Sequence, residues 1–251
     1  MTGVVERARR VVADSGRRWR RRRAVTVALP GGGTLRWRRD ERYPATMLDG
    51  TYEPDLVAHL HRALSPGGCL LDLGANSGYL SFLAKAQVGH DGRVVAVEPH
   101  PENLATLRDR QALNAGLPIE VLPVAAAPEA GQVALHLTRN LANSRIEAAG
   151  WDHEKPALDE VVVAARTLDD LVGAAAPDVV KVDIEGAEGA VLDASAGPSS
   201  WPTRPVLLVE YHGHENRDRC VAAARRWGWT SRDEPGDGGL PTGLLVLEAP
   251  R

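Results

Sequence analysis

The chain of 251 residues is poor in cysteine, lysine and aromatic side chains, and it has no long apolar run. Its two cysteines, Cys69 and Cys220, lie far apart and outside any CxxC spacing, which excludes a disulfide framework and a zinc motif. No apolar stretch approaches the ~18 residues of a membrane span, and the first residues lack the apolar segment of a signal peptide. With 43% apolar and 25% charged residues, the composition is that of a globular protein. We therefore expect a cytoplasmic protein without a transmembrane segment.

The arginines, which far outnumber the lysines, gather near the N-terminus. Residues 1–45 hold thirteen arginines and four acidic residues, whereas the rest of the chain has a net negative charge. Residues 4–19 have the apolar spacing of a basic amphipathic helix, and residues 24–37 have two short β-type runs around a Pro-Gly-rich turn. We predict that residues 1–48 form an appendage to a main domain of residues 49–251. The helix either packs on that domain or contacts an anionic membrane surface, RNA or an acidic partner.

From residue 69 onward, short apolar runs alternate with helical patterns. The predicted strands cover residues 69–73, 93–97, 119–123, 132–137, 179–183 and 206–210. The predicted helices cover residues 54–64, 79–86, 101–114, 167–172, 187–194 and 215–227. Such alternation is typical of βαβ units that form a parallel sheet covered on both faces. The runs 229–232 and 242–247 then indicate a hairpin, so the predicted fold is an α/β sheet finished by antiparallel strands.

The first strand-to-helix connection carries a ligand-binding signal. It reads Leu70-Leu71-Asp72-Leu73-Gly74-Ala75-Asn76-Ser77-Gly78-Tyr79. Gly74 and Gly78 let the backbone turn tightly and approach a ligand, and the helix behind them offers free N–H groups. Asp72 and Asn76 add polar side chains at the mouth. Because the spacing lacks the second glycine of Gly-x-Gly-x-x-Gly, it disfavours a nicotinamide or flavin dinucleotide, and with it a dehydrogenase.

An acidic residue closes the next predicted strand. Glu98 comes twenty positions after Gly78, the arrangement in which a carboxylate accepts both hydroxyls of a ribose. Pro99 directs the chain into the following helix, and Asn103 lies in its first turn. Together with the glycine turn, these residues predict a nucleoside-binding site.

Two later strands also end in ionisable residues. Asp183 ends one predicted strand and is followed by Glu185 and Glu188, and the next strand ends in Glu210-Tyr211-His212. Because the carboxyl ends of parallel strands meet at the ligand-binding edge of a sheet, we expect Asp183, Glu210 and His212 beside the reactive end of the ligand. Glu185 and Glu188 have an alternative role as partners of a helix dipole.

At these residues the sequence resembles the FkbM family of class I S-adenosylmethionine-dependent methyltransferases. The resemblance rests on the segments Gly50-Thr51-Tyr52-Glu53-Pro54, Leu71-Asp72-Leu73-Gly74-Ala75-Asn76-Ser77-Gly78, Val97-Glu98-Pro99-His100-Pro101-Glu102-Asn103, Arg166-Thr167-Leu168-Asp169-Asp170-Leu171, Lys181-Val182-Asp183-Ile184-Glu185-Gly186-Ala187-Glu188 and Val209-Glu210-Tyr211-His212. It implies a Rossmann-like, seven-stranded, mostly parallel sheet with an antiparallel last strand, and S-adenosylmethionine as cofactor. It also implies O-methylation of a hydroxyl on a small molecule, such as a secondary metabolite or a sugar.

The residue patterns and the resemblance together assign a set of site residues. The cofactor-binding set is Glu53, Asp72, Gly74, Asn76, Ser77, Gly78, Glu98, Pro99, Asn103, Ala125 and Asp183, and the catalytic set is Asp183, Glu210 and His212. Ala125 belongs to the run Val124-Ala125-Ala126-Ala127, where many relatives carry a polar residue near the adenine. Any adenine contact there would be made by the backbone.

The acceptor hydroxyl has to lose its proton, and two routes are open. His212 suits the role of base through its unperturbed pKa near 6.5, whereas Glu210 would need a raised pKa. Alternatively, Asp183 and Glu210 bind a divalent cation such as Mg²⁺ that acidifies the hydroxyl. With no obvious third ligand this route is not favoured, and no metal ligand is assigned. The segment 138–156 has the length of a substrate lid, in which Asn143 and Ser144 would touch the acceptor.

Two rival functions remain at this level. One is an RNA methyltransferase that uses the basic N-terminal segment to bind its substrate, and the other is a non-catalytic scaffold that binds S-adenosylmethionine. Against RNA, no Asn/Asp-Pro-Pro-aromatic segment follows the strand 179–183, and an acidic rim repels phosphates. The oligomeric state is not indicated by the sequence.

Overall fold

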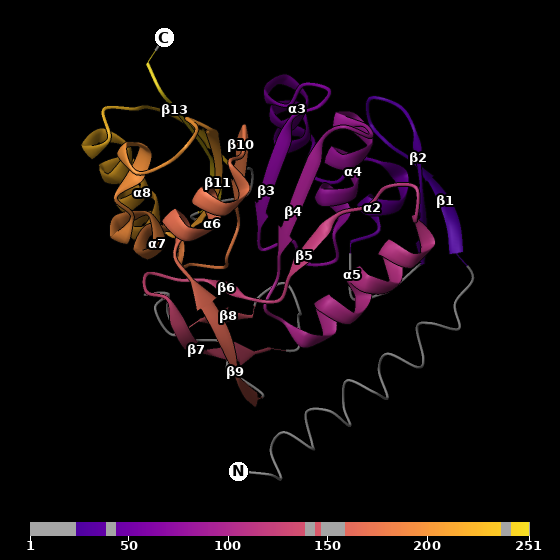
Figure 1. Ribbon diagram of the computed structural model, residues 1–251, viewed down its shortest axis with the longest axis horizontal. Coiled ribbons are helices and arrows are strands. Elements are labelled where there is room, and N and C mark those ends of the chain that lie inside the picture. The colour runs from indigo at the N-terminus through magenta and orange to yellow at the C-terminus, as the bar shows by residue number, and fades with distance from the viewer. Residues whose placement is uncertain (1–23, 39–43, 139–143, 147–158, 237–241, 251) are drawn as a thin grey trace.

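The computed structural model describes residues 24–38, 44–138, 144–146, 159–236 and 242–250, and Figure 1 shows their arrangement. The basic helix predicted for residues 4–19 and the proposed acceptor contact Asn143 lie outside the described residues. Within the described part of the chain, no helix combines the length and apolar character needed to cross a bilayer.

A seven-stranded sheet forms the centre of the fold, in the order β12-β13-β11-β10-β3-β4-β5. Its strands are β3 (Cys69–Leu73), β4 (Arg93–Val97), β5 (Glu120–Leu122), β10 (Val179–Val182), β11 (Val206–His212), β12 (Thr230–Pro235) and β13 (Thr242–Glu248). The pairs from β11 to β5 are parallel, whereas β13 runs antiparallel to both β11 and β12. The predicted Rossmann-like sheet with an antiparallel last strand is therefore confirmed.

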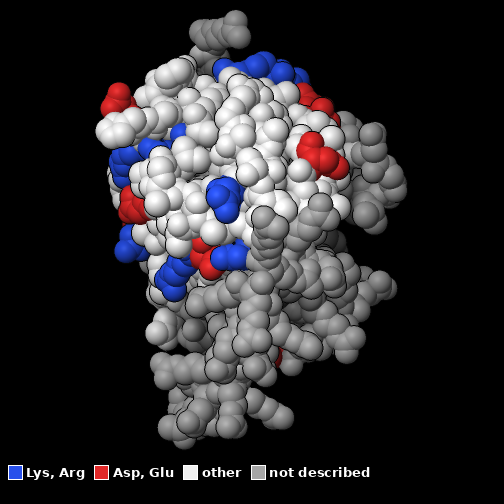
Figure 2. Space-filling model, turned by 90° about the vertical axis from the view of Figure 1, so that its right-hand side faces the viewer, with Lys and Arg blue, Asp and Glu red and all other residues white. Residues whose placement is uncertain are grey.

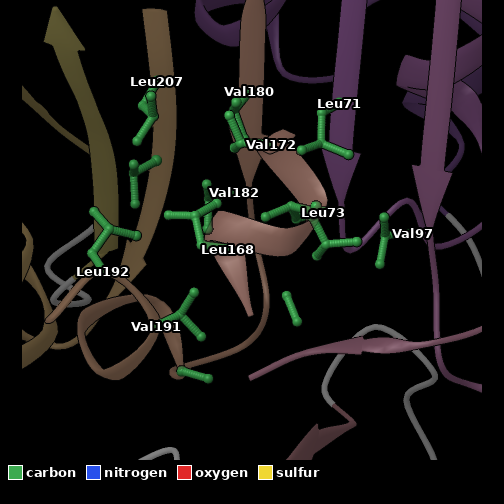
Figure 3. Packing of buried hydrophobic residues seen from close by; sticks show 14 of the residues in the cluster. Leu71, Leu73, Val97, Leu168, Val172, Val180, Val182, Val191, Leu192 and Leu207 are labelled. Carbon is green, nitrogen blue, oxygen red and sulfur yellow. The ribbon is translucent and has the colours of Figure 1, made fainter. Parts of the chain in front are cut away.

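Helices cover both faces of this sheet, because its strands are apolar on both sides (Figure 1). Leu71 and Val180 face a cluster that includes α6 (Leu168–Ala175), α7 (Glu188–Ala194) and α8 (His214–Arg226). Figure 3 shows the centre of this cluster. Leu70 and Val179, one position earlier on the same strands, face a second cluster with α3 (Pro54–Ala63) and α4 (Tyr79–Val88). The alternation of neighbouring residues between the clusters follows from the period of two in a strand.

The hairpin predicted before residue 48 is present and is packed into the main core. It consists of β1 (Ala24–Ala28) and β2 (Thr34–Arg38), and α2 (Thr46–Asp49) follows it. Val27, Leu35 and Trp37 belong to the same apolar cluster as α3 and α4. The guanidinium of Arg110, from α5 (Pro101–Leu113), lies 3.4 Å from the centre of the Trp37 ring. The described part of the predicted appendage thus shares its core with the central sheet.

The strand predicted for residues 132–137 is present, but it lies outside the central sheet. These residues lie in β7 (Gly131–Leu137), which belongs to a second sheet of order β6-β9-β7-β8. Its other strands are β6 (Ala125–Ala126), β8 (Arg145–Ile146) and β9 (Asp159–Arg166). The strand β9 was not predicted from the sequence. It pairs antiparallel with β7, and its Val162 side chain is 64% exposed. An apolar run on a half-exposed strand resembles a buried one in sequence, so the pattern alone did not separate the two sheets.

Candidate active site

A cleft opens at the carboxyl ends of β3, β4 and β10, between the central sheet and the second sheet. It encloses about 570 Å³ of empty space, its open mouth included. Seven residues of the predicted cofactor set line it: Gly74, Asn76, Glu98, Pro99, Asn103, Ala125 and Asp183. The second sheet adds Ala126, Leu135 and Ile146, which give this side of the cleft an apolar wall. Ser144, a predicted acceptor contact, also lines the cleft.

The glycine turn after β3 closes tightly against the end of β10. Gly74 has a φ of +78°, and a Cβ at this position would overlap the backbone carbonyl of Asp183. Asn76 also adopts the left-handed region, with a φ of +51°, and its N–H donates to Glu98 Oε2 at 2.7 Å. The turn therefore requires glycine at position 74 and is joined to the end of β4 through the Glu98 carboxylate.

Glu98 is buried and lines the cleft, and its carboxylate accepts hydrogen bonds from several N–H groups. Its Oε1 accepts the His100 N–H at 2.7 Å and the Asn103 side-chain amide at 3.4 Å. Burial raises the pKa of the Glu98 carboxyl to about 7, although the donors from His100, Asn76 and Asn103 oppose that shift. The carboxylate is thus held in a fixed orientation and borders the cleft, where its remaining lone pairs suit hydroxyl donors.

This pKa makes cofactor affinity dependent on pH if Glu98 binds the ribose. Hydroxyl groups donate to the ionised carboxylate, so binding lowers the pKa of Glu98 and the affinity rises as the pH increases through about 7. We expect the dissociation constant of S-adenosylhomocysteine to fall about tenfold between pH 6 and pH 8 and to level off above that. Isothermal titration calorimetry at both pH values measures this change.

A control is needed because burial also raises the pKa of Glu185, which lines the same cleft, to about 8. The contribution of Glu98 is therefore the difference between the wild-type profile and that of Glu98→Gln, whose side chain stays neutral. A wild-type profile no steeper than the Glu98→Gln profile would contradict the ribose assignment.

Asp72, predicted to contact the cofactor, lies behind the turn and does not line the cleft. It is fully buried, accepts the Ser81 hydroxyl at 2.5 Å and lies 3.3 Å from the Lys181 ammonium. Lys181 Nζ also lies 3.2 Å from Asp183 Oδ2 and donates to the Gly74 carbonyl at 2.8 Å. Burial alone would lower the pKa of Lys181, but the charges of Asp183 and Asp72 outweigh it and raise the pKa.

Lys181 is the site residue that the sequence assignment missed. It ties the Gly74 turn of β3 to Asp183 at the end of β10, and thus fixes the two walls of the cleft relative to each other. The sequence did contain a signal for Lys181, which is one of three lysines in the chain and lies within an apolar strand. A lysine at such a position needs a buried anionic partner.

Ser77 and Gly78 do not line the cleft either. The Ser77 hydroxyl is 3.8 Å from Met47 Sδ, and its carbonyl accepts the Arg110 guanidinium at 2.8 Å. Gly78 adopts a φ of +84°, and a Cβ there would press on Phe82 and Leu107. Both residues shape the turn from behind, as Asp72 does.

The acidic rim predicted around Asp183 is present, and His212 lies within it. His212 Nδ1 is 3.1 Å from Glu188 Oε1, while its Nε2 is 4.0 Å from Asp183 Oδ1 and 3.8 Å from Glu185 Oε2. Burial alone would lower the pKa of His212, but the hydrogen bond to Glu188 and the surrounding carboxylates raise it to about 10. The unperturbed value near 6.5, on which the sequence argument for a histidine base depended, therefore does not apply here.

Glu53 and Glu210 line a separate groove, together with Asp55 and Glu234. Burial, reinforced by the charge of Asp183, raises the pKa of Glu53 to about 7 and that of Glu210 to about 9. Glu53, which was predicted to bind the cofactor, lines this groove and does not line the cleft. Both glutamates are thus electrostatically coupled to Asp183, which lines the cleft.

The groups that line the cleft suit an adenosine-bearing ligand. They include Gly74, which has no side chain, the fixed Glu98 carboxylate, and the small side chains of Ala125 and Ala126. The buried Oδ1 of Asn76 has no hydrogen-bond partner among the described residues, which leaves an acceptor for a ligand. Together with the strand order, this cleft defines a class I S-adenosylmethionine-dependent methyltransferase.

The chain belongs to the FkbM methyltransferase family, because the family model described as "Methyltransferase FkbM domain" matches residues 72–231. Its cofactor is S-adenosylmethionine. A curated relative, arsenite methyltransferase from Halobacterium salinarum, is 42% identical over 52 residues, which are 21% of this chain and 13% of that protein. The matched segment thus spans a small part of that relative.

Two solved structures align with most of this chain. The precorrin-6y C5,15-methyltransferase of Geobacter metallireducens GS-15 has a TM-score of 0.52 and 16% identity, over 82% of this chain and 92% of that one. Fibrillarin from Aeropyrum pernix, with natively bound S-adenosyl-L-methionine, has a TM-score of 0.49 and 16% identity, over 91% of this chain and 96% of that one. At such identities the similarity concerns the fold alone.

Proposed function

We propose that this protein transfers the methyl group of S-adenosylmethionine to a hydroxyl of a small molecule, such as a secondary metabolite or a sugar. The observation that carries the proposal is the acidic groove of Glu53, Asp55, Glu210 and Glu234 beside Asp183. Carboxyl groups, protonated or ionised, offer hydrogen-bond partners to the hydroxyl groups of a neutral compound, whereas they offer no positive charge to a phosphate backbone.

The charge on the surface agrees with a small-molecule acceptor. On the face in Figure 2, basic and acidic side chains of the described residues are interspersed among uncharged ones. Binding of nucleic acid is typically supported by a clustered basic surface, which that view does not show over the described residues.

The residues of the predicted cofactor set that line the cleft each have a role in this proposal. Glu98 accepts the ribose hydroxyls, and Gly74 and Asn76 let the backbone approach the ligand. Pro99 and Asn103 border the ribose, and the backbone of Ala125 meets the adenine. Asp183 lies at the methionine end. When bound, the cofactor supplies a cationic sulfonium whose methyl group is already activated for transfer.

The groups at the rim orient the acceptor and receive its proton. Glu210, from β11, borders the acceptor groove, and His212 at the end of the same strand lies 4.0 Å from Asp183, which lines the cleft. Alignment of the acceptor oxygen with the methyl group is the larger contribution, since well-oriented reactants reach effective molarities of about 10⁵–10⁸ M. A positioned base adds about 10²–10⁴-fold.

The role of Glu210 can be separated from cofactor binding. Glu210→Gln keeps the shape of the side chain and removes its basicity, so we expect kcat to fall about 100-fold or more. The dissociation constant of S-adenosylhomocysteine should stay within about twofold, because Glu210 does not line the cleft. Glu129→Gln, which changes an exposed carboxylate elsewhere, serves as the control. An unchanged kcat in Glu210→Gln would remove Glu210 from the reaction.

The proposed substrate class is tested by labelling. The full chain is incubated with S-adenosylmethionine carrying an isotopic methyl label, in parallel with a pool of hydroxylated small molecules and with total RNA. We expect label in the small-molecule pool, and NMR spectra of the product should show a methoxyl group. Label in RNA alone would contradict the proposal and support the RNA methyltransferase. Cofactor binding without transfer to either pool would support the scaffold.

A further inference from the structure

We infer that Asp183, Glu188 and His212 form a binding site for a divalent transition-metal ion at the edge of the cofactor cleft. One potential ligand atom from each of the three residues lies within 4.8 Å of the other two. The three residues come from different elements, namely the turn after β10, the start of α7 and the end of β11. The fold therefore brings together a nitrogen and two carboxylates that are distant in sequence.

Several carboxyl groups of the described residues gather at this place. Asp183, Glu185 and Glu188 all surround the His212 ring. Lys181 lies next to Asp183 and is shared with the fully buried Asp72. Buried carboxylates are stable when they are paired with cations or coordinate metal ions. A divalent cation would therefore be a suitable partner for this group.

One oxygen of the Glu188 carboxylate makes several contacts, whereas the other has no hydrogen-bond partner among the described residues. Its Oε1 accepts the N–H groups of Ile184 at 3.1 Å and Gly186 at 3.0 Å, and it lies 3.1 Å from His212 Nδ1. Glu188 is fully buried, and its Oε2 has no hydrogen-bond partner among the described residues. An unpartnered carboxylate oxygen in the interior is costly unless it meets a ligand.

The separations between the donor atoms match those around a shared ion. His212 Nε2 lies 4.0 Å from Asp183 Oδ1, while Asp183 Oδ2 is turned towards Lys181. Two donors that each lie about 2.1 Å from one ion are about 3–4 Å apart, depending on the angle between them. The separation of 3.1 Å between His212 Nδ1 and Glu188 Oε1 falls within the same range.

The donor set indicates the kind of ion. Mg²⁺ prefers oxygen ligands alone, whereas one imidazole with two carboxylates suits Mn²⁺, Fe²⁺, Co²⁺ or Zn²⁺. Asp183 also lines the cofactor cleft, so the ion would lie beside the reacting groups. There it would lower the pKa of a bound acceptor hydroxyl. This last role rests on the proposed function, whereas binding of the ion does not.

The site is tested by titrating MnCl₂ and ZnCl₂, with MgCl₂ for comparison, into the full chain after treatment with a chelator. We expect one Mn²⁺ or Zn²⁺ per chain by calorimetry, and weaker binding of Mg²⁺. His212→Gln and Glu188→Gln should each weaken binding by at least about tenfold. The matched control is His90→Gln, because His90 Nδ1 lies 3.1 Å from Asp91 Oδ1 in a fully exposed pair. This control should bind the ions as the wild type does.

Absence of ion binding to the wild type, or equal binding by His212→Gln, would overturn the inference. Should the variants fail to fold, pulsed EPR of the Mn²⁺-loaded wild type decides the question, since a bound imidazole nitrogen must appear in the spectrum and its absence refutes the site. Titration of S-adenosylhomocysteine into the same samples separates the two proposals. Cofactor binding without ion binding refutes the metal site and leaves the proposed function standing.

Discussion

Replacement of Glu98 by alanine should weaken the binding of S-adenosylhomocysteine by about 30- to 700-fold, or about 2–4 kcal/mol. In the proposed binding mode, the variant loses two charge-assisted hydrogen bonds to the ribose hydroxyls. The Asn76 and His100 N–H groups, which now donate to Glu98 at 2.7 Å each, also lose their acceptor. The turn that holds the cofactor is therefore loosened at the same time. Calorimetric titration of wild type and variant measures the change.

The control for this variant is Glu120→Ala. Glu120 is exposed and pairs with Arg93 at 3.4 Å, at the opposite end of β4 from Glu98. An exposed change of this kind is expected to alter stability or affinity by about 0.5 kcal/mol or less. If the affinity of Glu98→Ala equals that of Glu120→Ala, the ribose does not lie on Glu98.

The second large effect is expected from Gly74→Ala, which should abolish detectable cofactor binding and lower the unfolding temperature strongly. The added Cβ would overlap the Asp183 carbonyl, so the turn after β3 and the end of β10 have to separate. Moreover, the φ of +78° disfavours any residue other than glycine. Thermal unfolding and calorimetry measure both consequences.

Gly67→Ala isolates the conformational part of this effect. Gly67 has a nearly identical φ of +80°, but a Cβ there would meet no atom within 4 Å. Its substitution should cost about 1–2 kcal/mol of stability and leave cofactor binding intact. Equal losses of stability in the two variants would mean that the contact between Gly74 and Asp183 does not constrain the cleft.

The central strands were predictable because they are buried on both faces. The predicted bounds 69–73 and 93–97 agree with β3 and β4, since uninterrupted apolar runs bounded by glycine, proline or charge have few alternative structures. The second sheet was not predictable from the same signal. Its β9 strand follows a long polar segment and pairs with β7 across twenty or more intervening residues, a pairing that a local pattern does not encode.

The cofactor half of the site was predictable for a related reason. Gly74 and Glu98 are the residues that come directly after two neighbouring strands, β3 and β4, so the sheet alone brings them together. The rim around His212 depends on tertiary packing. Its raised pKa comes from Glu188, which α7 places against the end of β11, and sequence reasoning had left Glu188 as a possible helix-dipole partner. Lys181 was missed because its partners, Asp72 and Asp183, meet only across the β3–β10 pair.

A crystal structure of the full chain with S-adenosylhomocysteine tests the central claim most directly. The account predicts both ribose hydroxyls within hydrogen-bonding distance of the Glu98 carboxylate, the adenine between Pro99 and Ala125, and the sulfur facing Asp183. An adenosine bound elsewhere, with Glu98 still contacting only Asn76, His100 and Asn103, would contradict it.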